Sequence, residues 1–202
     1  MNTWQNVHND SGNKEYGTPA PIIEAARRAM GSIDLDVASA GCFNKTVQAA
    51  RYISIRQLTR WYHKRPSGLD VPWTTIDGRP VNAWMNHPFG RAANPLWIDK
   101  VLSEWEAGNV KRACVLTFAE QSSSWGVKLS RFPRWIPKKR IGFVDRYGRQ
   151  LNGAGKGIMV TGVGVNLYEF CKAFYYCEIP GGVDYRINIQ FNVELQANKE
   201  DL

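Results

Sequence analysis

The sequence predicts a single α/β domain in which a mixed sheet lies between two layers of helices. Three observations carry this prediction: apolar runs of strand length alternate with amphipathic helical stretches, a hairpin pattern follows them, and no linker divides the chain. The chain has 202 residues, of which 44% are hydrophobic and 22% charged, a composition typical of one globular domain. We expect a loose polar arm over residues 1–15 and one domain over residues 16–202.

The first three predicted elements are a helix, a strand and a helix, over residues 22–30, 33–37 and 45–63. Thr18 is a candidate N-cap, Pro19 favours the first helical position, and Gly31 ends the first helix. The strand has apolar residues at alternate positions, and the small residues 38–41 follow it. Basic residues at i, i+4 and i+8 place a positive stripe on one face of the second helix.

The next predicted elements are a strand, a helix and a strand, over residues 81–85, 97–106 and 110–118. Both strands are apolar runs, and the helix between them is amphipathic and ends at Gly108. Residues 141–144 and 157–163 bracket a turn-rich stretch, which predicts an antiparallel hairpin at the end of the sheet. Residues 187–193 alternate apolar and polar side chains, which is the pattern of an edge strand.

The charge of the chain favours a polyanionic partner, because the formal net charge is +8. Residues 44–69 contain six basic residues and no acid, and residues 131–149 contain seven against the single Asp145. Phe132 and Trp135 are interleaved in the second stretch. One such stretch is compatible with a solvated surface, but two in one domain favour contact with nucleic acid. The candidate DNA-binding residues are Arg56, Arg60, Lys64, Arg131, Arg134, Lys138, Lys139 and Arg140.

Composition argues against several other classes. No apolar stretch approaches the roughly 18 residues that span a membrane, and the start of the chain has no apolar segment of the signal-peptide kind. The chain has four cysteines without a Cys-x-x-Cys pair and only three histidines. We therefore expect free thiols, no metal site and a cytoplasmic protein.

The tetrapeptide Asn86-His87-Pro88-Phe89 directly follows the apolar run 81–85, so we expect it in the loop at the carboxyl end of a buried strand. Ligands of open α/β sheets bind at that position. An Asn side chain and a neighbouring backbone carbonyl accept the two N–H bonds of a planar amino group. The proline stiffens the turn without offering a donor, and the phenylalanine offers a face for stacking a base. The pattern predicts a site for an amine, although Asn-x-Pro-aromatic also occurs in ordinary turns.

The tetrapeptide resembles the Asn-Pro-Pro-Tyr/Phe motif of amino-methyltransferases that use S-adenosylmethionine. Together with residues 15–19, 35–39, 97–100, 121–125, 143–145 and 157–164, it stands in an order that resembles the phage-associated Dam-type DNA adenine-N6 methyltransferases. The resemblance covers roughly residues 15–180. It implies a Rossmann-like fold, S-adenosyl-L-methionine as cofactor, and methyl transfer to adenine N6 of a flipped base in double-stranded DNA. It also implies the cytoplasm of a bacterial host as the location.

The resemblance also assigns roles to individual residues. The catalytic candidates are Asn86, His87, Pro88 and Phe89. The cofactor-binding candidates are Tyr16, Thr18, Pro19, Asp36, Ala38, Ser39 and Asp70. The first three of these match an opening segment that walls the cofactor pocket. The next three match the first sheet motif, whose following loop approaches the methionine part of the cofactor, and Asp70 matches an acidic position near its adenine.

Two features depart from the family pattern and leave alternatives open. His87 replaces a proline, which keeps the backbone carbonyl as an acceptor but reduces rigidity, and the first sheet motif lacks the usual glycine-rich turn. One alternative is a catalytically degenerate nucleic-acid-binding protein on a methyltransferase frame. Another is a methyltransferase of a different amine, such as cytosine N4, an RNA base or a glutamine side chain. A purely structural phage protein is a third, but it leaves the ordered motifs unexplained.

Overall fold

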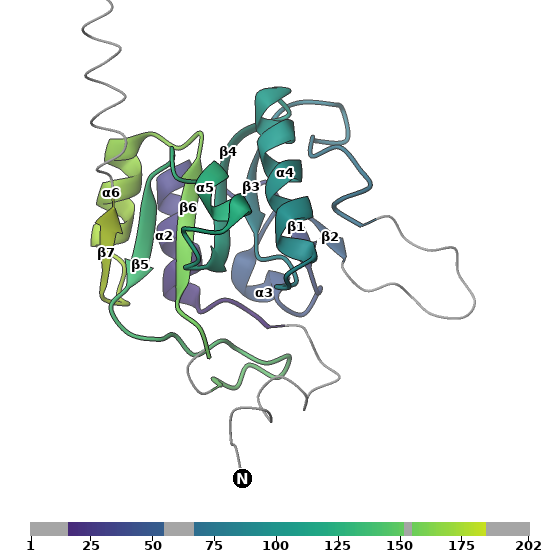
Figure 1. Cartoon of the computed structure of the whole chain (residues 1–202). Helices are drawn as coiled ribbons and strands as arrows, with labels where there is room; N and C mark the ends of the chain where they lie inside the picture. Colours follow the sequence, from purple (N-terminus) through teal and green to yellow (C-terminus); the bar gives the residue numbers. More distant parts are fainter. Residues whose placement is uncertain (1–15, 55–66, 152–154, 185–202) are drawn as a thin grey trace, which may run out of the picture.

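The computed structural model describes residues 16–54, 67–151 and 155–184, whose helices and strands are shown in Figure 1. The predicted arm over residues 1–15 lies outside the described residues. In chain order the elements are α2 (Ala20–Met30), β1 (Leu35–Ser39), α3 (Asn44–Val47), β2 (Arg51–Ser54), β3 (Val81–Met85), α4 (Ala93–Glu106), β4 (Val110–Phe118), α5 (Ser124–Lys128), β5 (Arg134–Pro137), β6 (Ile158–Val163), α6 (Leu167–Tyr175) and β7 (Gly181–Asp184).

The strands of the described residues form one seven-stranded mixed sheet in the order β2-β1-β3-β4-β6-β5-β7. β2, β1, β3 and β4 are parallel, β6 runs antiparallel between β4 and β5, and β7 runs antiparallel to β5. From β1 the chain passes to β2 on one side and then to β3 on the other, so the order of the strands reverses between β1 and β3. The carboxyl ends of strands at such a reversal form the ligand-binding crevice of open α/β sheets.

Helices cover both faces of this sheet. α2 packs against α6 on one face, whereas α4 packs against β4 and α5 on the other (Figure 1). Successive side chains of a strand point to opposite faces. Trp84 accordingly joins the core beneath α2, while Ala83 and Met85 join the core beneath α4. Burial on both faces explains the continuous apolar runs of the central strands, and the predicted three-layer α/β sandwich is confirmed.

Several predicted bounds agree closely with the structure. β3 and β4 coincide with the predicted strands 81–85 and 110–118, while β1 is displaced by two residues from 33–37. α2 and α4 extend the predicted helices at their N-termini. The predicted N-cap is wrong: α2 begins at Ala20, so Pro19 occupies the N-cap position and makes no side-chain hydrogen bond there. The Thr18 hydroxyl instead accepts a hydrogen bond from Asn86 in the site described below.

The predicted helix over residues 45–63 is confirmed only as far as Val47 and is wrong over residues 48–54. α3 ends at Val47, Gln48 adopts a φ of 48°, and the chain then forms β2. Arg51 and Tyr52 of β2 pair with β1, so hydrogen bonding to a strand elsewhere in the sequence outweighs the local helical pattern. Residues 55–66, which include Arg56, Arg60 and Lys64, lie outside the described residues.

The predicted hairpin of residues 141–144 with 157–163 is wrong in its first strand. β6 pairs with β4 and β5, so β5 and β6 form the hairpin of the sheet. Val144 makes only isolated bridges, with Gly17 and Gln150. The predicted edge strand 187–193 lies outside the described residues, and β7 is the edge that the structure shows. None of the helices in the described part of the chain is long and apolar enough to cross a membrane.

Candidate active site at the carboxyl ends of β1 and β3

The loop after β3 is bound to a segment at the start of the described chain. The Asn86 side-chain nitrogen Nδ2 donates to the Tyr16 carbonyl oxygen at 2.9 Å and to the Thr18 hydroxyl at 3.2 Å. A backbone carbonyl only accepts hydrogen bonds, so this contact determines which way the Asn86 amide points. The amide oxygen Oδ1 consequently faces away from residues 16–18. Among the described residues, it has no hydrogen-bond partner and remains an available acceptor.

His87 anchors the same loop in the core. Its side chain is 2% exposed, and Nε2 lies 3.1 Å from Oδ1 of Asn94, which is 3% exposed. The backbone N–H of Gly90 also donates to this oxygen at 3.1 Å, and the Asn94 N–H returns a bond to the Gly90 carbonyl at 2.9 Å. Because an amide oxygen only accepts, Nε2 of His87 carries the proton. Asn94 therefore closes the loop at residues 87 and 90 and joins it to the first turn of α4.

Burial keeps the His87 imidazole neutral. Desolvation lowers its pKa to about 4, although the hydrogen bond to Asn94 opposes this shift. Nδ1 is buried and has no partner among the described residues. The ring lies between two aromatic side chains, at 5.4 Å from Phe89 and 5.8 Å from Trp97 between centroids. Packing and the hydrogen bond to Asn94 hold His87 in place.

We expect His87 to make the stability of the protein depend on pH. In the unfolded chain the imidazole takes up a proton near pH 6.5, whereas in the folded protein its pKa is about 4. Stability from this group is therefore fully present above pH 6.5 and is lost as the pH falls towards 4. The loss amounts to roughly 3 kcal/mol. Chemical unfolding of the wild type and His87→Gln, from neutral pH downwards, measures it.

The comparison with His87→Gln is needed because the titration of Asp36 changes the stability of the protein in the opposite direction. Burial raises the pKa of Asp36 to about 6, so its carboxyl group stabilises the fold as the pH falls through that value. Glutamine keeps an N–H for Asn94 but does not titrate, and the Asp36 contribution cancels in the difference. The wild type should lose stability relative to the variant on acidification. Parallel stability curves would contradict a buried neutral imidazole.

Phe89 belongs to an aromatic cluster. Its ring centroid lies 4.6 Å from that of Phe118 at the end of β4 and 6.4 Å from that of Phe143. Phe143 in turn lies 6.3 Å from Tyr16, whose carbonyl holds Asn86. Phe89 is only partly buried in this cluster. The catalytic candidates and the first cofactor candidates are thus brought together, although Phe89 does not stand free as a stacking face.

The residues of the first sheet motif lie deeper than the sequence pattern indicated. Asp36, Ala38 and Ser39 are all buried, and the Asp36 carboxylate accepts the Ala38 N–H at 3.3 Å. The chain reaches the surface just beyond them, at Gly41 and Cys42. The part of this loop that can meet a ligand therefore begins two residues after the predicted positions.

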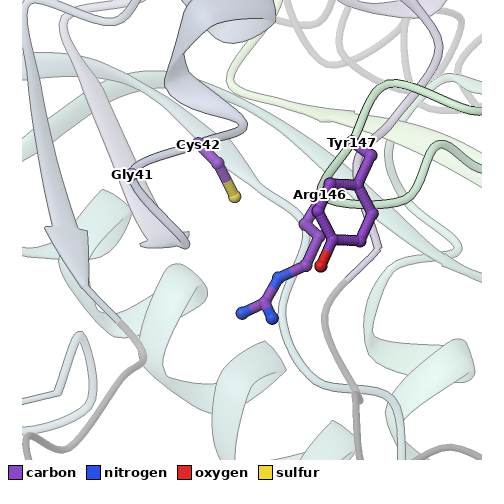
Figure 2. A pocket seen from close by; sticks show the side chains of 4 residues that line it. All are labelled: Gly41, Cys42, Arg146 and Tyr147. Atoms are coloured by element: carbon purple, nitrogen blue, oxygen red, sulfur yellow. The ribbon is translucent and has the colours of Figure 1, made fainter.

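A pocket of about 510 Å³ opens at this loop and is lined by Gly41, Cys42, Arg146 and Tyr147. In Figure 2, Arg146 and Tyr147 lie opposite Cys42 across the pocket. The segment that carries Arg146 and Tyr147 is bound to Gly17, because the N–H and the carbonyl of Gly17 pair with Val144 at 2.7 and 2.8 Å. A Cβ at Gly17 would lie 2.6 Å from the ring of Phe43, which directly follows the pocket residue Cys42. The pocket therefore adjoins the segment around Tyr16, whose carbonyl holds Asn86. The sequence analysis did not identify the four lining residues.

Asp70 is exposed on a turn that packs against the end of β1. Its carboxylate accepts the Ser67 N–H at 2.8 Å. A Cβ at Gly68 in the same turn would lie 2.3 Å from the Val37 carbonyl oxygen, so only glycine permits this close approach. Asp70 therefore lies near the carboxyl end of β1, on the same side of the domain as the pocket.

The predicted basic surface divides between two edges of the sheet. β5 runs parallel to β4, so Lys138, Lys139 and Arg140 follow its carboxyl end at the edge that carries Asn86, and all three are exposed. Arg134 is 3% exposed within β5 and does not belong to this surface. Arg131 lies beside the end of α4, where it pairs with Glu106 at 3.1 Å, and is separated from the site.

No protein-family model matches this chain, and no curated protein is found as a relative. In residues 16–54, 67–151 and 155–184, no group of three or more His, Cys, Asp or Glu side chains is arranged to hold a metal ion. The fold and the site define an α/β protein whose strand order reverses between β1 and β3, with a pocket beside the loop that follows β1.

Proposed function

We propose that the protein is a DNA methyltransferase that transfers a methyl group from S-adenosyl-L-methionine to adenine N6. The observation that carries the proposal is the orientation of Asn86. Its Nδ2 is occupied by Tyr16 and Thr18, so Oδ1 is presented at the carboxyl end of β3 as an acceptor for an amine. An amine donor is the complement of such a group.

The residues of the loop supply the positioning that this reaction needs. The adenine amine is a poor nucleophile because its lone pair is delocalised into the ring. Asn86 Oδ1 and the His87 carbonyl would accept its two N–H bonds and aim the lone pair. Tyr16 and Thr18 orient the Asn86 amide, and the Asn94 contacts hold His87 and the rest of the loop. Rate enhancement then comes from orientation and electrostatics, without a general base.

We place the cofactor in the pocket beside Gly41 and Cys42. Its volume of about 510 Å³ falls in the roughly 300–1,000 Å³ range of small-ligand sites. The loop after β1 would hold the cofactor, with residues 16–18 between it and Asn86. When bound, the cofactor would supply an electrophilic methyl group to the amine. The sulfonium would leave as the neutral thioether S-adenosylhomocysteine, and the methylated amine would lose one proton to solvent. Asp36 is buried, and its carboxylate accepts the Ala38 N–H, so it supports the backbone at the end of β1 rather than lining the pocket.

Charge favours nucleic acid as the substrate. The chain carries a net charge of +8, and exposed Lys138, Lys139 and Arg140 lie at the edge of the sheet that carries Asn86. The deciding experiment is transfer of a labelled methyl group to unmethylated duplex DNA, followed by digestion to nucleosides. Label in N6-methyl-2′-deoxyadenosine supports the proposal. DNA binding with no transfer and no cofactor affinity favours the degenerate binding protein instead.

We expect Lys138→Glu to weaken DNA binding and flatten its salt dependence. Each phosphate contact contributes a slope of about 0.9 in the plot of log affinity against log salt concentration. Lys111→Glu is the matched control, because Lys111 is exposed near the start of β4, at the opposite edge of the sheet. Anisotropy titrations of a labelled duplex at several salt concentrations measure both variants. Equal effects of the two reversals would place the DNA surface elsewhere.

A further inference from the structure

The turn over residues 145–149 is rigid and lies at the edge of the sheet that carries Asn86. Asp145 Oδ1 accepts the N–H groups of Tyr147 and Arg149, both at 2.9 Å, and Oδ2 pairs with Arg149 Nε at 2.8 Å. The Gly148 N–H closes the turn on the Asp145 carbonyl at 3.0 Å, and Gly148 has a φ of 83°. These bonds hold the backbone of the turn independently of what its outward side chains contact.

The turn displays an aromatic ring between two cations. Tyr147 is 73% exposed, and the guanidinium carbons of Arg149 and Arg146 lie 5.2 and 5.9 Å from its ring centroid. Arg149 is held by Asp145, whereas no carboxylate of the described residues pairs with Arg146. An exposed ring flanked by guanidinium groups matches a nucleic acid, which offers base faces and phosphates together.

The turn is tied to the candidate active site. Val144, the residue before it, pairs with Gly17, and the adjacent Tyr16 carbonyl holds Asn86. Arg146 and Tyr147 also form the outer wall of the pocket, opposite Cys42 (Figure 2). A DNA strand that brings a base to Asn86 would pass this wall.

We propose that the 145–149 turn is a DNA-contacting element, in which Tyr147 stacks on a base and Arg146 neutralises a phosphate. Arg149, held by Asp145, keeps the tyrosine ring in place. The choice of DNA rests on the proposed function. Tyr147 is 73% exposed, so its ring is accessible to a base of a bound DNA strand.

The test compares two exposed tyrosines, each with a cation near its ring. Tyr168 is 68% exposed with Lys172 Nζ at 5.9 Å from its ring centroid. It is the second residue of α6, which follows β6. Because β6 runs antiparallel to β4, the start of α6 lies at the sheet edge opposite the carboxyl end of β3. Tyr147→Ala should weaken binding of a fluorescent unmethylated duplex about tenfold. Tyr147→Phe and Tyr168→Ala should bind as the wild type does.

One further measurement completes the test. Arg146→Ala should reduce the salt slope of DNA binding by about 0.9. Unchanged DNA binding by Tyr147→Ala would overturn the inference. DNA binding is measured without cofactor, so failure of the wild type to methylate DNA would count against the proposed function alone.

Discussion

Replacing Asn86 with alanine is expected to reduce methyl transfer about a hundred- to a thousandfold, the effect of removing one preorganised hydrogen-bonding group from an active site. The variant loses the Oδ1 acceptor for the substrate amine, whereas the basic residues at the site edge are untouched. DNA affinity should therefore stay within about twofold of the wild type, since phosphate contacts dominate it. Methyl-transfer rates and anisotropy titrations on the same duplex separate the two quantities.

Asn86→Asp is the informative control for this prediction. Aspartate keeps an acceptor oxygen but loses the Nδ2 donor that binds the Tyr16 carbonyl and the Thr18 hydroxyl. We expect it to retain more activity than Asn86→Ala and less than the wild type, because the acceptor survives while its orientation does not. A fully active Asn86→Ala protein would rule out the catalytic assignment.

Replacing Asn94 with leucine is expected to cost both stability and turnover. Asn94 Oδ1 accepts from His87 Nε2 and from the Gly90 N–H, and leucine leaves these donors without their acceptor. Each unpaired buried donor costs roughly 1–3 kcal/mol of folding free energy. Displacement of the loop by about 1 Å would lower turnover about a hundredfold. Chemical unfolding and single-turnover kinetics measure the two effects.

Asn94→Asp distinguishes loop positioning from a general loss of packing. It retains an acceptor of nearly the same shape for both donors, so we expect turnover to fall far less than in Asn94→Leu. The carboxylate should also raise the pKa of His87, because a negative charge at hydrogen-bond distance favours the imidazolium. NMR titration of the histidine detects that shift. Equal losses of turnover in the two variants would show that the hydrogen bonds do not position the loop.

Local sequence signals were sufficient to predict the central strands of the fold. β3 and β4 have the predicted bounds because buried strands must be apolar on both faces, and that requirement appears directly in the sequence. The placement of Asn86 just beyond β3 follows from the same signal. The charge of the chain and its tetrapeptide motif also belong to the sequence alone, and they were sufficient to propose a nucleic-acid amine as the substrate.

Contacts between distant segments determined the rest, and no local pattern encodes them. Residues 51–54 form a strand because β1 offers a pairing edge. Thr18 does not cap α2, and its hydroxyl accepts a hydrogen bond from Asn86, 68 positions away in sequence. Strand direction separated Lys138 from Arg131, although both belong to one basic stretch. The sequence by itself determined the layers, the central strands and the chemistry of one loop. The tertiary structure decided which side chains orient that loop and which cations share its edge, because both depend on strand order and on packing between elements.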